Sequence, residues 1–470
     1  MSSLKTDTIQ EEPEKEHEHV IERLRVRLSK TPLTIVVFGA SGHLARTKTY
    51  PSLADLFQEK VLPKTLNIIG YARSKLTQKE FHAQISESLK LGDRLQEFLS
   101  YCTYFQGEGY DNDDSLKKLG EYMKELENEK IKKESLKCKT KAANRLFYLA
   151  TPPNVFGQLS EKIKKHLSHH PIKNRDDHSK KKEEEEAEIG WKRVIVEKPF
   201  GEDSESCEKL LAAMGEHLEE SEIYRIDHYL AKEMVQNLLV LRFSNTLWDS
   251  LWDRRSIKCV KISIKETEGV DGRGGYYDEY GVIRDVFQNH LLQILCLIAM
   301  EAPVHLQADD IRTEKQKQPT TTTTTVGSQA NGSISQPPFF VVGQYGASAD
   351  GKLPSYLQDP SIKKLNPTSK QVTFAQMVLF VQNRRWNGVP FICKCGKALD
   401  NKNAEIRIQF KNDELSLYPD AVINELVIRL QPSEAIWLRL NTKTPGFARF
   451  QSTYPTYLDL TYQTRFGHHF

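Results

Sequence analysis

The stretch RIDHYLAKE contains Asp227, His228, Tyr229 and Lys232, so that a carboxylate, an imidazole, a phenol and an ammonium group fall within a few residues. Residues 231–243, AKEMVQNLLVLRF, follow with apolar residues at three- and four-residue spacing, which predicts a helix with one buried face. The four polar side chains are therefore expected at or just before a helix N-terminus, where free N–H groups and the helix dipole favour an anion. The pattern indicates a site for a phosphorylated ligand. The alternative is an ordinary helix start whose charges face water.

A glycine-rich turn near the amino end has the features of a dinucleotide-binding site. Residues 34–38, TIVVF, predict a buried strand, and the turn GASGHLA of residues 39–45 follows at once. Glycines let the backbone approach a pyrophosphate, which the dipole of the next helix holds. Residues 66–72, LNIIGYA, predict the next strand of a crossover unit, and Arg73 follows it. An arginine here accommodates the 2′-phosphate of NADP, whereas a solvated arginine is the alternative.

Two further residues have types and positions suited to a reaction. Residues 192–196, KRVIV, predict a strand, and Lys198 follows at its carboxyl end, where ligands gather in open α/β sheets. The alternative is a lysine that only terminates the strand. His290 lies in the apolar segment 284–300, RDVFQNHLLQILCLIAM, which predicts a helix. Imidazole titrates near neutrality and suits a general base, but a lone histidine in such a helix is more often a core residue.

These side chains have to be positioned by two domains. The amino-terminal part predicts an α/β Rossmann-like, doubly wound domain over residues 32–226. Residues 227–470 predict a larger α+β domain, because alternation in residues 257–265, IKCVKISIK, and 405–410, EIRIQF, indicates strands with one covered face. A mixed or antiparallel sheet is therefore expected in the second domain. The whole chain has 470 residues, which is sufficient for the hydrophobic cores of both domains.

Three polar stretches are expected to be solvated additions without a part in the reaction. Residues 1–31 are charged and predict a disordered extension. Residues 166–188 combine histidines with a basic and then an acidic run, and residues 316–338 include six consecutive threonines. Residues 166–188 are interpreted as a charged insertion in the amino-terminal domain. Residues 316–338 are interpreted as a low-complexity loop in the second domain.

The composition excludes several kinds of protein. A formal net charge of +3 gives no bulk attraction to nucleic acid or to a membrane, and no apolar run of transmembrane length is apparent. Seven scattered cysteines do not form a disulfide framework, and Cys393 and Cys395 have no second pair nearby, so no metal site is predicted. The polar first residues do not resemble a signal peptide. We expect a cytoplasmic protein.

A series of longer motifs extends these local patterns from about Thr34 to about Tyr462. In order, they are GASGHLA, IIGYARS, ANRLFYLATPP, VIVEKPFG, RIDHYLAKEMVQNL, GRGGYYDEYGVIRDVFQNHLLQ, VQNRRWNGVPF, CGKAL, NELVIRLQP and LDLTY. Together they resemble the glucose-6-phosphate dehydrogenase family. The resemblance implies an NADP-linked enzyme of the pentose phosphate pathway that acts on glucose metabolism, in which glucose 6-phosphate is oxidised at C1 to 6-phosphoglucono-δ-lactone.

The same resemblance implies a role for individual residues. His290 would be the catalytic base, and Asp227 would orient it. The catalytic NADP would be bound by Gly39, Ala40, Ser41, Gly42, His43, Leu44, Ala45, Arg46, Arg73, Tyr148 and Lys198. The sugar and its phosphate would be bound by Lys198, His228, Tyr229, Lys232, Glu266, Asp285, Lys397, Lys402 and Gln431. A second, structural NADP would be bound by Lys394, Arg407, Arg429, Trp437, Arg439 and Asp459.

Two positions depart from the family's usual pattern. His43 stands where an Asp is usual in the first turn of the phosphate-binding helix, and Lys402 stands where an Arg is often found. The resemblance ends near residue 462, so the chain is expected to lack the family's carboxy-terminal end. An active dehydrogenase, a homodimer or homotetramer, is the main expectation. The alternative is a weak or inactive member that binds NADP or pairs with a full-length subunit.

Overall fold

The computed structural model describes residues 32–133, 143–168, 190–201, 203–270, 272–317, 320–321, 340–351, 353–412, 417–444 and 453–461. The predicted extension 1–31, and most of the insertion 166–188 and of the loop 316–338, lie outside the described residues. The chain divides into two compact units, Met1–Ile226 and Asp227–Phe470.

The first unit is built on a six-stranded parallel sheet with the order β3-β2-β1-β4-β5-β6. The direction of strand addition reverses between β1 and β4, which is the topological switch point of a doubly wound fold. The strands are β1 (Leu33–Phe38), β2 (Leu66–Ala72), β3 (Cys102–Gln106), β4 (Asn144–Leu149), β5 (Lys192–Glu197) and β6 (Ile223–Ile226).

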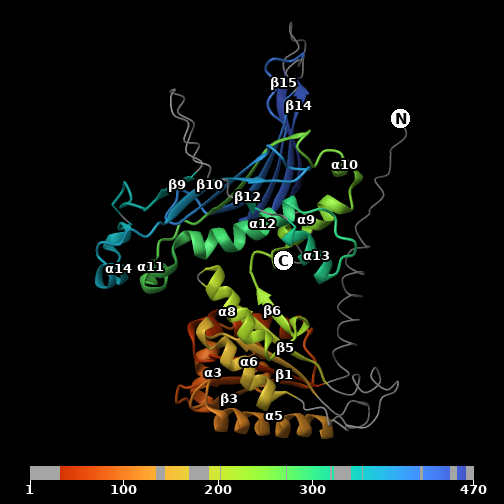
Figure 1. Cartoon of the computed structure of the whole chain (residues 1–470). Helices are drawn as coiled ribbons and strands as arrows, with labels where there is room; N and C mark the ends of the chain where they lie inside the picture. Colours follow the sequence, from red (N-terminus) through yellow and green to blue (C-terminus); the bar gives the residue numbers. More distant parts are fainter. Residues whose placement is uncertain are drawn as a thin grey trace. The chain divides into compact units, whose positions relative to one another are not determined.

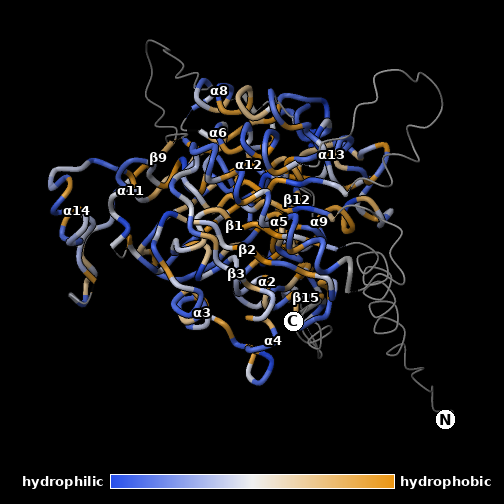
Figure 2. The backbone as a smooth tube through the Cα atoms, turned by 90° about the horizontal axis from the view of Figure 1, so that it is seen from below, coloured by the Kyte–Doolittle hydropathy of each residue, from blue (hydrophilic) through white to orange (hydrophobic). Residues whose placement is uncertain are grey.

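Helices cover both faces of this sheet (Figure 1). Because both faces are covered, alternate residues of β1 belong to different hydrophobic clusters. Ile35 and Val37 belong to one cluster, and Val36 and Phe38 belong to the other. Every residue of β1 is buried, as expected for a parallel strand between two helical layers. Figure 2 shows the resulting contrast between hydrophobic β1 and hydrophilic α3. The helical segments are η1 (Ala45–Thr49), α2 (Tyr50–Gln58), α3 (Gln78–Ser86), η2 (Gly92–Arg94), α4 (Leu95–Leu99), α5 (Asp113–Lys133), η3 (Pro153–Val155), α6 (Phe156–Lys162), η4 (Ile163–Leu167), α8 (Ser204–Gly215) and η5 (Glu220–Glu222).

The second unit contains a mixed, mostly antiparallel sheet with the order β15-β14-β13-β12-β7-β11-β10-β8, and β9 also pairs with β10. Among the described strands of this second sheet, only β7 and β11 pair in parallel. The predicted fold class is confirmed for both parts of the chain. The strands are β7 (Ile257–Lys265), β8 (Thr320–Thr321), β9 (Phe340–Gly343), β10 (Phe374–Val381), β11 (Pro390–Gly396), β12 (Asn403–Phe410), β13 (Glu425–Gln431), β14 (Ala435–Lys443) and β15 (Thr453–Thr461).

The helices of the second unit gather on one face of this sheet and share a single core with it (Figure 1). The predicted helix at residues 284–300 is part of a longer one that runs from Gly274 to Ala299. Its backbone bends at Gly281, whose φ of 66° is accessible to glycine at little cost. The helical segments are α9 (Glu233–Phe243), α10 (Thr246–Asp249), α11 (Gly274–Val282), η6 (Ile283–Leu291), α12 (Leu292–Ala299), α13 (Ala308–Gln316), η7 (Tyr356–Gln358) and α14 (Pro360–Leu365).

The helix from Gly274 to Ala299 is long and apolar enough to cross a membrane by length and composition. The sequence pattern missed this length, because the helix begins ten residues before residue 284. A core helix of a folded domain meets the same criterion, and 56% of its most apolar window is buried inside the protein. Since its apolar side chains belong to the core of the second unit, we interpret it as a core helix.

Long side chains from three other segments bind the carbonyl groups at the end of α12. Arg242 donates to the carbonyl oxygens of Leu297 at 2.5 Å and Met300 at 2.6 Å. The indole N–H groups of Trp252 and Trp386 donate to the next two carbonyls, of Ile298 at 3.0 Å and Ala299 at 2.9 Å. The last carbonyls of a helix have no partner within it, so these four bonds satisfy groups that burial would otherwise leave unpaired.

Candidate active site

The glycine turn after β1 is held against the end of β2. The N–H groups of Gly39 and Ala40 both donate to the carbonyl oxygen of Tyr71, at 2.9 and 3.2 Å. Gly39 has a φ of 81°, and a Cβ atom at this position would lie 2.3 Å from the carbonyl oxygen of Ala150. Only glycine meets both conditions. The turn therefore keeps its backbone open at the carboxyl edge of the sheet, where a pyrophosphate can approach it.

Polar side chains surround this turn. The hydroxyl groups of Ser41 and Ser74 lie 2.8 Å apart, and Arg73 follows β2 with an exposed guanidinium 5.8 Å from the centre of the Tyr110 ring. The Nε of Arg46 is buried and has no hydrogen-bond partner among the described residues. An unpaired buried N–H is costly unless a ligand satisfies it. The cradle and this orphan donor both fit a phosphate-bearing cofactor.

The next two strands supply the other residues predicted for the cofactor. Tyr148 lies on β4 and its hydroxyl donates to the carboxylate of Glu197 at the end of β5. Burial, together with this hydrogen bond, raises the pKa of the Tyr148 phenol well above its usual value. Lys198 follows directly, and its peptide bond to Pro199 is cis. Three predicted groups thus lie at the carboxyl ends of β1, β4 and β5, at the switch point of the sheet.

A buried histidine and carboxylate pair lies in the second unit. His290 is 2% exposed, and its Nδ1 is 2.7 Å from Oδ1 of Asp227. The same oxygen accepts the backbone N–H of Tyr229 at 2.8 Å, so the carboxylate is fixed by the turn that precedes α9. Burial disfavours the charged form of Asp227, but the hydrogen bond and positive field of His290 outweigh it and hold the pKa of this carboxyl below its usual value. His290 is therefore a partnered imidazole in a core helix.

The polar cluster at the start of α9 surrounds this pair. The ring centres of His228 and Tyr229 lie 4.4 and 4.5 Å from that of His290. Helix α9 begins at Glu233, two residues later than predicted, because Lys232 has an extended backbone with ψ of 135°. The Lys232 ammonium lies 5.4 Å from the centre of the Tyr229 ring, and burial is the main cause that lowers its pKa. A half-buried cation before a helix N-terminus suits a phosphate group.

Further predicted residues reach the same region from the sheet. Lys397 is only 7% exposed, and its ammonium contacts the Glu266 carboxylate at 2.5 Å. The Nε2 of Gln431 donates to the Tyr229 hydroxyl at 3.2 Å. Burial and the negative fields of Glu266 and Asp227 raise the pKa of Tyr229, which shows how close these groups are. The second unit thus assembles carboxylate, amide and ammonium groups beside His290.

Asp285 and Lys402 lie at the margins of this group. Asp285 precedes His290 on the same helix and accepts a hydrogen bond from the Tyr276 hydroxyl at 3.3 Å. Lys402 forms an ion pair with Glu268 at 2.9 Å, in which both side chains are about half exposed. The charge of Lys402 also acts on Lys232 and lowers its pKa. Both predicted residues therefore adjoin the cluster, but each already has a protein partner.

Sequence reasoning missed two charged residues of this region. Glu268 follows Glu266 by two positions, a spacing that could have indicated a shared face beyond the end of β7. Lys315 lies on α13, its ammonium donates to Gln293, and burial lowers its pKa while the charge of Asp227 opposes that shift. No local signal distinguishes Lys315 from other helical lysines.

Asp227, His228 and His290 place ligand atoms within 4.8 Å of one another, a spacing that a metal ion accepts. The sequence predicts no metal here. Two of the ligand atoms are already engaged with each other, because Asp227 bonds the Nδ1 of His290.

The residues predicted for a second cofactor lie on the other strands of this sheet. A cavity of about 430 Å³ contains five of the six, Arg407, Arg429, Trp437, Arg439 and Asp459, together with Glu425 and Tyr457. The guanidinium of Arg429 lies 4.9 Å from the Trp437 ring, and its buried Nε has no partner among the described residues. Lys394 is the exception: it lies on β11, which is separated from β12, the nearest cavity strand, by β7. It does not line the cavity.

The fold and the site define a class of enzyme. The first unit is a doubly wound domain with a glycine turn at its switch point, and the second holds a buried imidazole and carboxylate pair among ammonium, carboxylate and amide side chains. Such a chain is a dehydrogenase that uses a nicotinamide dinucleotide.

Two family models match almost the whole chain, and the chain belongs to the glucose-6-phosphate dehydrogenase family. "Glucose-6-phosphate dehydrogenase, NAD binding domain" matches residues 36–237, and "Glucose-6-phosphate dehydrogenase, C-terminal domain" matches residues 239–470. The predicted resemblance is confirmed.

Individual relatives agree with this assignment. The chain is 45% identical to the Glucose-6-phosphate 1-dehydrogenase of Cyberlindnera jadinii, over 93% of this chain and 80% of the relative. It is 42% identical to that of Emericella nidulans, over 93% and 78%. A solved structure described as glucose-6-phosphate dehydrogenase in complex with its substrate glucose-6-phosphate is 39% identical, with a TM-score of 0.80 over 94% of this chain and 84% of that one. The chain is thus shorter than the relatives it matches.

Proposed function

We propose that the protein oxidises the C1 hydroxyl of β-D-glucose 6-phosphate by hydride transfer to NADP, giving 6-phosphoglucono-δ-lactone and NADPH. The family and the relatives named Glucose-6-phosphate 1-dehydrogenase support this reaction. The substrate is the one named for the related solved structure. The observation that carries the proposal is the buried His290, with its Nδ1 bonded to Asp227 at 2.7 Å.

His290 is the proposed catalytic base. Its Nδ1 bonds the Asp227 carboxylate, which leaves Nε2 to accept the proton of the C1 hydroxyl. This assignment fixes the neutral tautomer with the proton on Nδ1, donated to Asp227. As the imidazole becomes positively charged, the nearby carboxylate stabilises it. NADP, when bound, would supply the acceptor for the hydride that leaves C1.

The sugar phosphate is assigned to the cluster before α9. Lys232 and His228 provide cationic and N–H donors, Tyr229 provides a hydroxyl, and Lys402 adds a further positive charge when it exchanges Glu268 for the phosphate. The sugar hydroxyls are assigned to Glu266, Lys397, Asp285 and Gln431, whose carboxylate, ammonium and amide groups alternate as donors and acceptors.

NADP is the proposed cofactor, rather than NAD. The turn from Gly39 to Arg46 supplies the phosphate-binding backbone, and Arg73 supplies a cation for the 2′-phosphate. His43 is exposed in the first helical turn, and no side-chain capping bond is found at Leu44, the residue before η1. Tyr148 and Lys198 are assigned to the nicotinamide end, and Lys198 is also assigned to the sugar.

A second NADP is assigned to the cavity on β12 to β15. Its arginines suit phosphate groups and its tryptophan suits a base, and the Trp437 and Arg429 pair is an example of the second kind of contact. NADP titration of the wild type and of Arg429→Gln tests this assignment. Two binding equivalents reduced to one support it, and an unchanged stoichiometry refutes it.

We further propose a cytoplasmic homodimer or homotetramer. One relative, from Arabidopsis thaliana, is named chloroplastic, so compartments differ among relatives. Size-exclusion chromatography with light scattering measures the oligomer, and cell fractionation locates it.

The decisive experiment is the appearance of NADPH absorbance when the purified chain is given NADP and glucose 6-phosphate. His290→Asn is the matched variant, because it keeps a polar side chain of similar shape and removes the base. We expect turnover by the wild type and its near-complete loss in the variant. A folded, NADP-binding wild type without turnover would favour the weak or inactive family member instead.

A further inference from the structure

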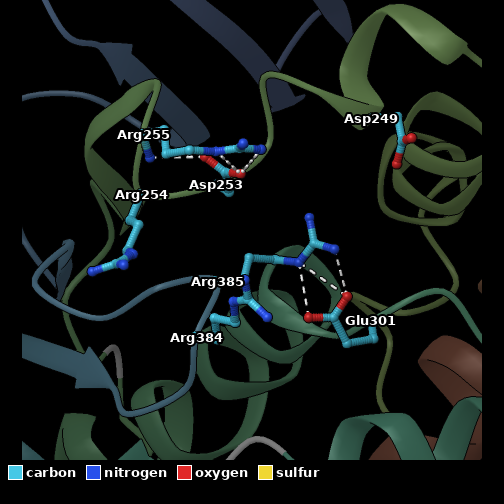
Figure 3. Close-up of a pocket in the computed structure, with 7 residues that line it drawn as sticks. All are labelled: Asp249, Asp253, Arg254, Arg255, Glu301, Arg384 and Arg385. Carbon is cyan, nitrogen blue, oxygen red and sulfur yellow. Dashed lines mark hydrogen bonds and ion pairs between the residues drawn. The ribbon is translucent and has the colours of Figure 1, made fainter.

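A second charged cavity, of about 380 Å³, lies in the second unit and shares no residue with the proposed active site. It is formed where α10 ends, where the chain turns before β7, where α12 ends and where β10 leads to β11 (Figure 3). Four guanidinium groups and three carboxylates line it. These belong to Asp249, Asp253, Arg254, Arg255, Glu301, Arg384 and Arg385.

Two of the arginines are already engaged. Arg385 binds the Glu301 carboxylate through Nε and Nη2, at 2.9 and 2.5 Å, and donates from Nη1 to the carbonyl oxygen of Trp252 at 3.0 Å. Arg255 binds Asp253, with its Nη2 at 2.5 Å and its Nε at 2.8 Å from the carboxylate. Each of these carboxylates has its pKa lowered chiefly by its hydrogen-bonded arginine, so both pairs stay charged. Within each pair, the arginine and the carboxylate neutralise each other's charge.

The other two arginines are not engaged. Arg254 and Arg384 are exposed, and neither side chain has a hydrogen bond or ion pair in the part of the chain that the structure describes. Figure 3 shows both without a dashed line, whereas Arg385 and Arg255 are joined to their carboxylates. The backbone N–H of Arg254 donates to the carbonyl oxygen of Arg385 at 2.8 Å, which ties the two segments together at this point. The exposed guanidinium groups of Arg254 and Arg384 therefore come from two segments that this backbone hydrogen bond joins.

The surrounding field favours an anion. Asp249 is the one lining carboxylate without an arginine bonded to it, and Figure 3 draws it apart from the others. The guanidinium of Arg242 is buried, and its pKa, lowered to about 9 mainly by burial, is lowered further by Arg385. The lining residues themselves carry four guanidinium groups against three carboxylates, so the cavity has a net positive charge.

We propose that this cavity binds a small phosphorylated metabolite between Arg254 and Arg384. Guanidinium forks match the oxygens of a phosphate group, and the volume is that of a small-molecule site. Among the described residues, none that lines the cavity is aromatic, so there is no ring on which a base could stack and a compact anion fits better than a nucleotide. The cavity shares no residue with the phosphate cluster at Lys232, with the glycine turn at Gly39 or with the cavity on β12 to β15, so it is a separate place for a phosphate group.

Calorimetric titration tests the proposal, with inorganic phosphate and a sugar bisphosphate, fructose 1,6-bisphosphate, as probes. Lys232→Met is introduced first to weaken the other phosphate site. Binding should persist in that protein and weaken by about a hundredfold when Arg254→Gln and Arg384→Gln are added, about tenfold for each guanidinium lost. Arg312→Gln, an exposed arginine elsewhere in the same unit, is the control for the change in charge and should have no effect.

The outcomes separate the ligand sources and can overturn the proposal. Tighter binding of the sugar bisphosphate than of inorganic phosphate identifies a metabolite site, while equal binding reduces it to a site for free phosphate and refutes the metabolite assignment. Unchanged binding in the double variant, or none in Lys232→Met, refutes the site itself. Circular dichroism checks folding, and the single variants replace the double one if it does not fold, since both side chains are exposed.

Discussion

Substitution of Asp227 by Asn isolates the charge of the proposed dyad. One oxygen of this carboxylate, Oδ1, accepts both the Nδ1 of His290 at 2.7 Å and the N–H of Tyr229 at 2.8 Å. The Asn side chain keeps an oxygen in that position, so both hydrogen bonds and the turn before α9 can be retained. What is lost is the negative charge beside an imidazole that becomes positive in the reaction.

The size of the effect follows from the geometry. Opposite charges about 4 Å apart interact by about 4 kcal/mol at the effective dielectric constant of about 20 that describes such sites. If this stabilisation is present in the transition state and absent while His290 is neutral, kcat falls by about a thousandfold. KM for glucose 6-phosphate should change little, because the ground-state contacts remain.

Steady-state rates of NADPH formation measure both constants. The matched control is Asp310→Asn, which alters another histidine and aspartate pair: His305 Nδ1 and Asp310 Oδ2 lie 3.0 Å apart, but the His305 side chain is 68% exposed. Solvent screens that pair, so its loss should leave kcat unchanged. A kcat of Asp227→Asn within about threefold of the wild type, which amounts to well under 1 kcal/mol, would refute the view that Asp227 stabilises a charged His290.

Three further predictions concern other parts of the site. Lys232→Met should raise KM for glucose 6-phosphate about tenfold to a hundredfold with little change in kcat, because a charge-assisted contact to the phosphate is lost. Steady-state kinetics measure both constants. An unchanged KM would show that Lys232 does not bind the phosphate. Gly39→Ala should destabilise the protein by at least about 1–3 kcal/mol in denaturant unfolding, because φ is 81° and the new Cβ would meet the Ala150 carbonyl; equal stability would show that the turn can rearrange. The pKa of Asp227 is lower in the folded state than in the unfolded chain, so its contribution to stability is present above about pH 4 and lost as pH falls further; acid unfolding of Asp227→Asn should lack this component.

Local patterns in the sequence were sufficient for the strands predicted at residues 34–38, 66–72, 192–196, 257–265 and 405–410, all of which the structure contains. The strands at 66–72 and 257–265 have the predicted bounds, because apolar runs and alternation respectively report burial on two faces or one. The helix predicted from Ala231 begins at Glu233, since periodicity does not reveal that Lys232 is extended. The sequence pattern does not reveal the backbone bend at Gly281 either. The predicted helix that carries His290 is therefore too short at its N-terminal end.

Contacts between distant segments could not be predicted in the same way. Lys397 reaches Glu266 and Lys402 reaches Glu268 because β7 lies between β11 and β12, an order that strand patterns do not specify. His290 illustrates the same limit. Its helix predicts a core position, which is correct, but only the fold brings Asp227 to its Nδ1. Pattern alone therefore left the base and the core residue as alternatives.

The four bonds at the end of α12 have a consequence for how this chain can change over evolution. Arg242, Trp252 and Trp386 bind consecutive carbonyls from Leu297 to Met300, so that end of the helix is held in place by α9 and by the segments before β7 and before β11. His290 lies further back on the same helix. A single inserted or deleted residue between them would turn its side chain by about 100° and displace it by about 1.5 Å, away from Asp227. Active descendants of this sequence should therefore vary in residue type between His290 and Met300, but never in length.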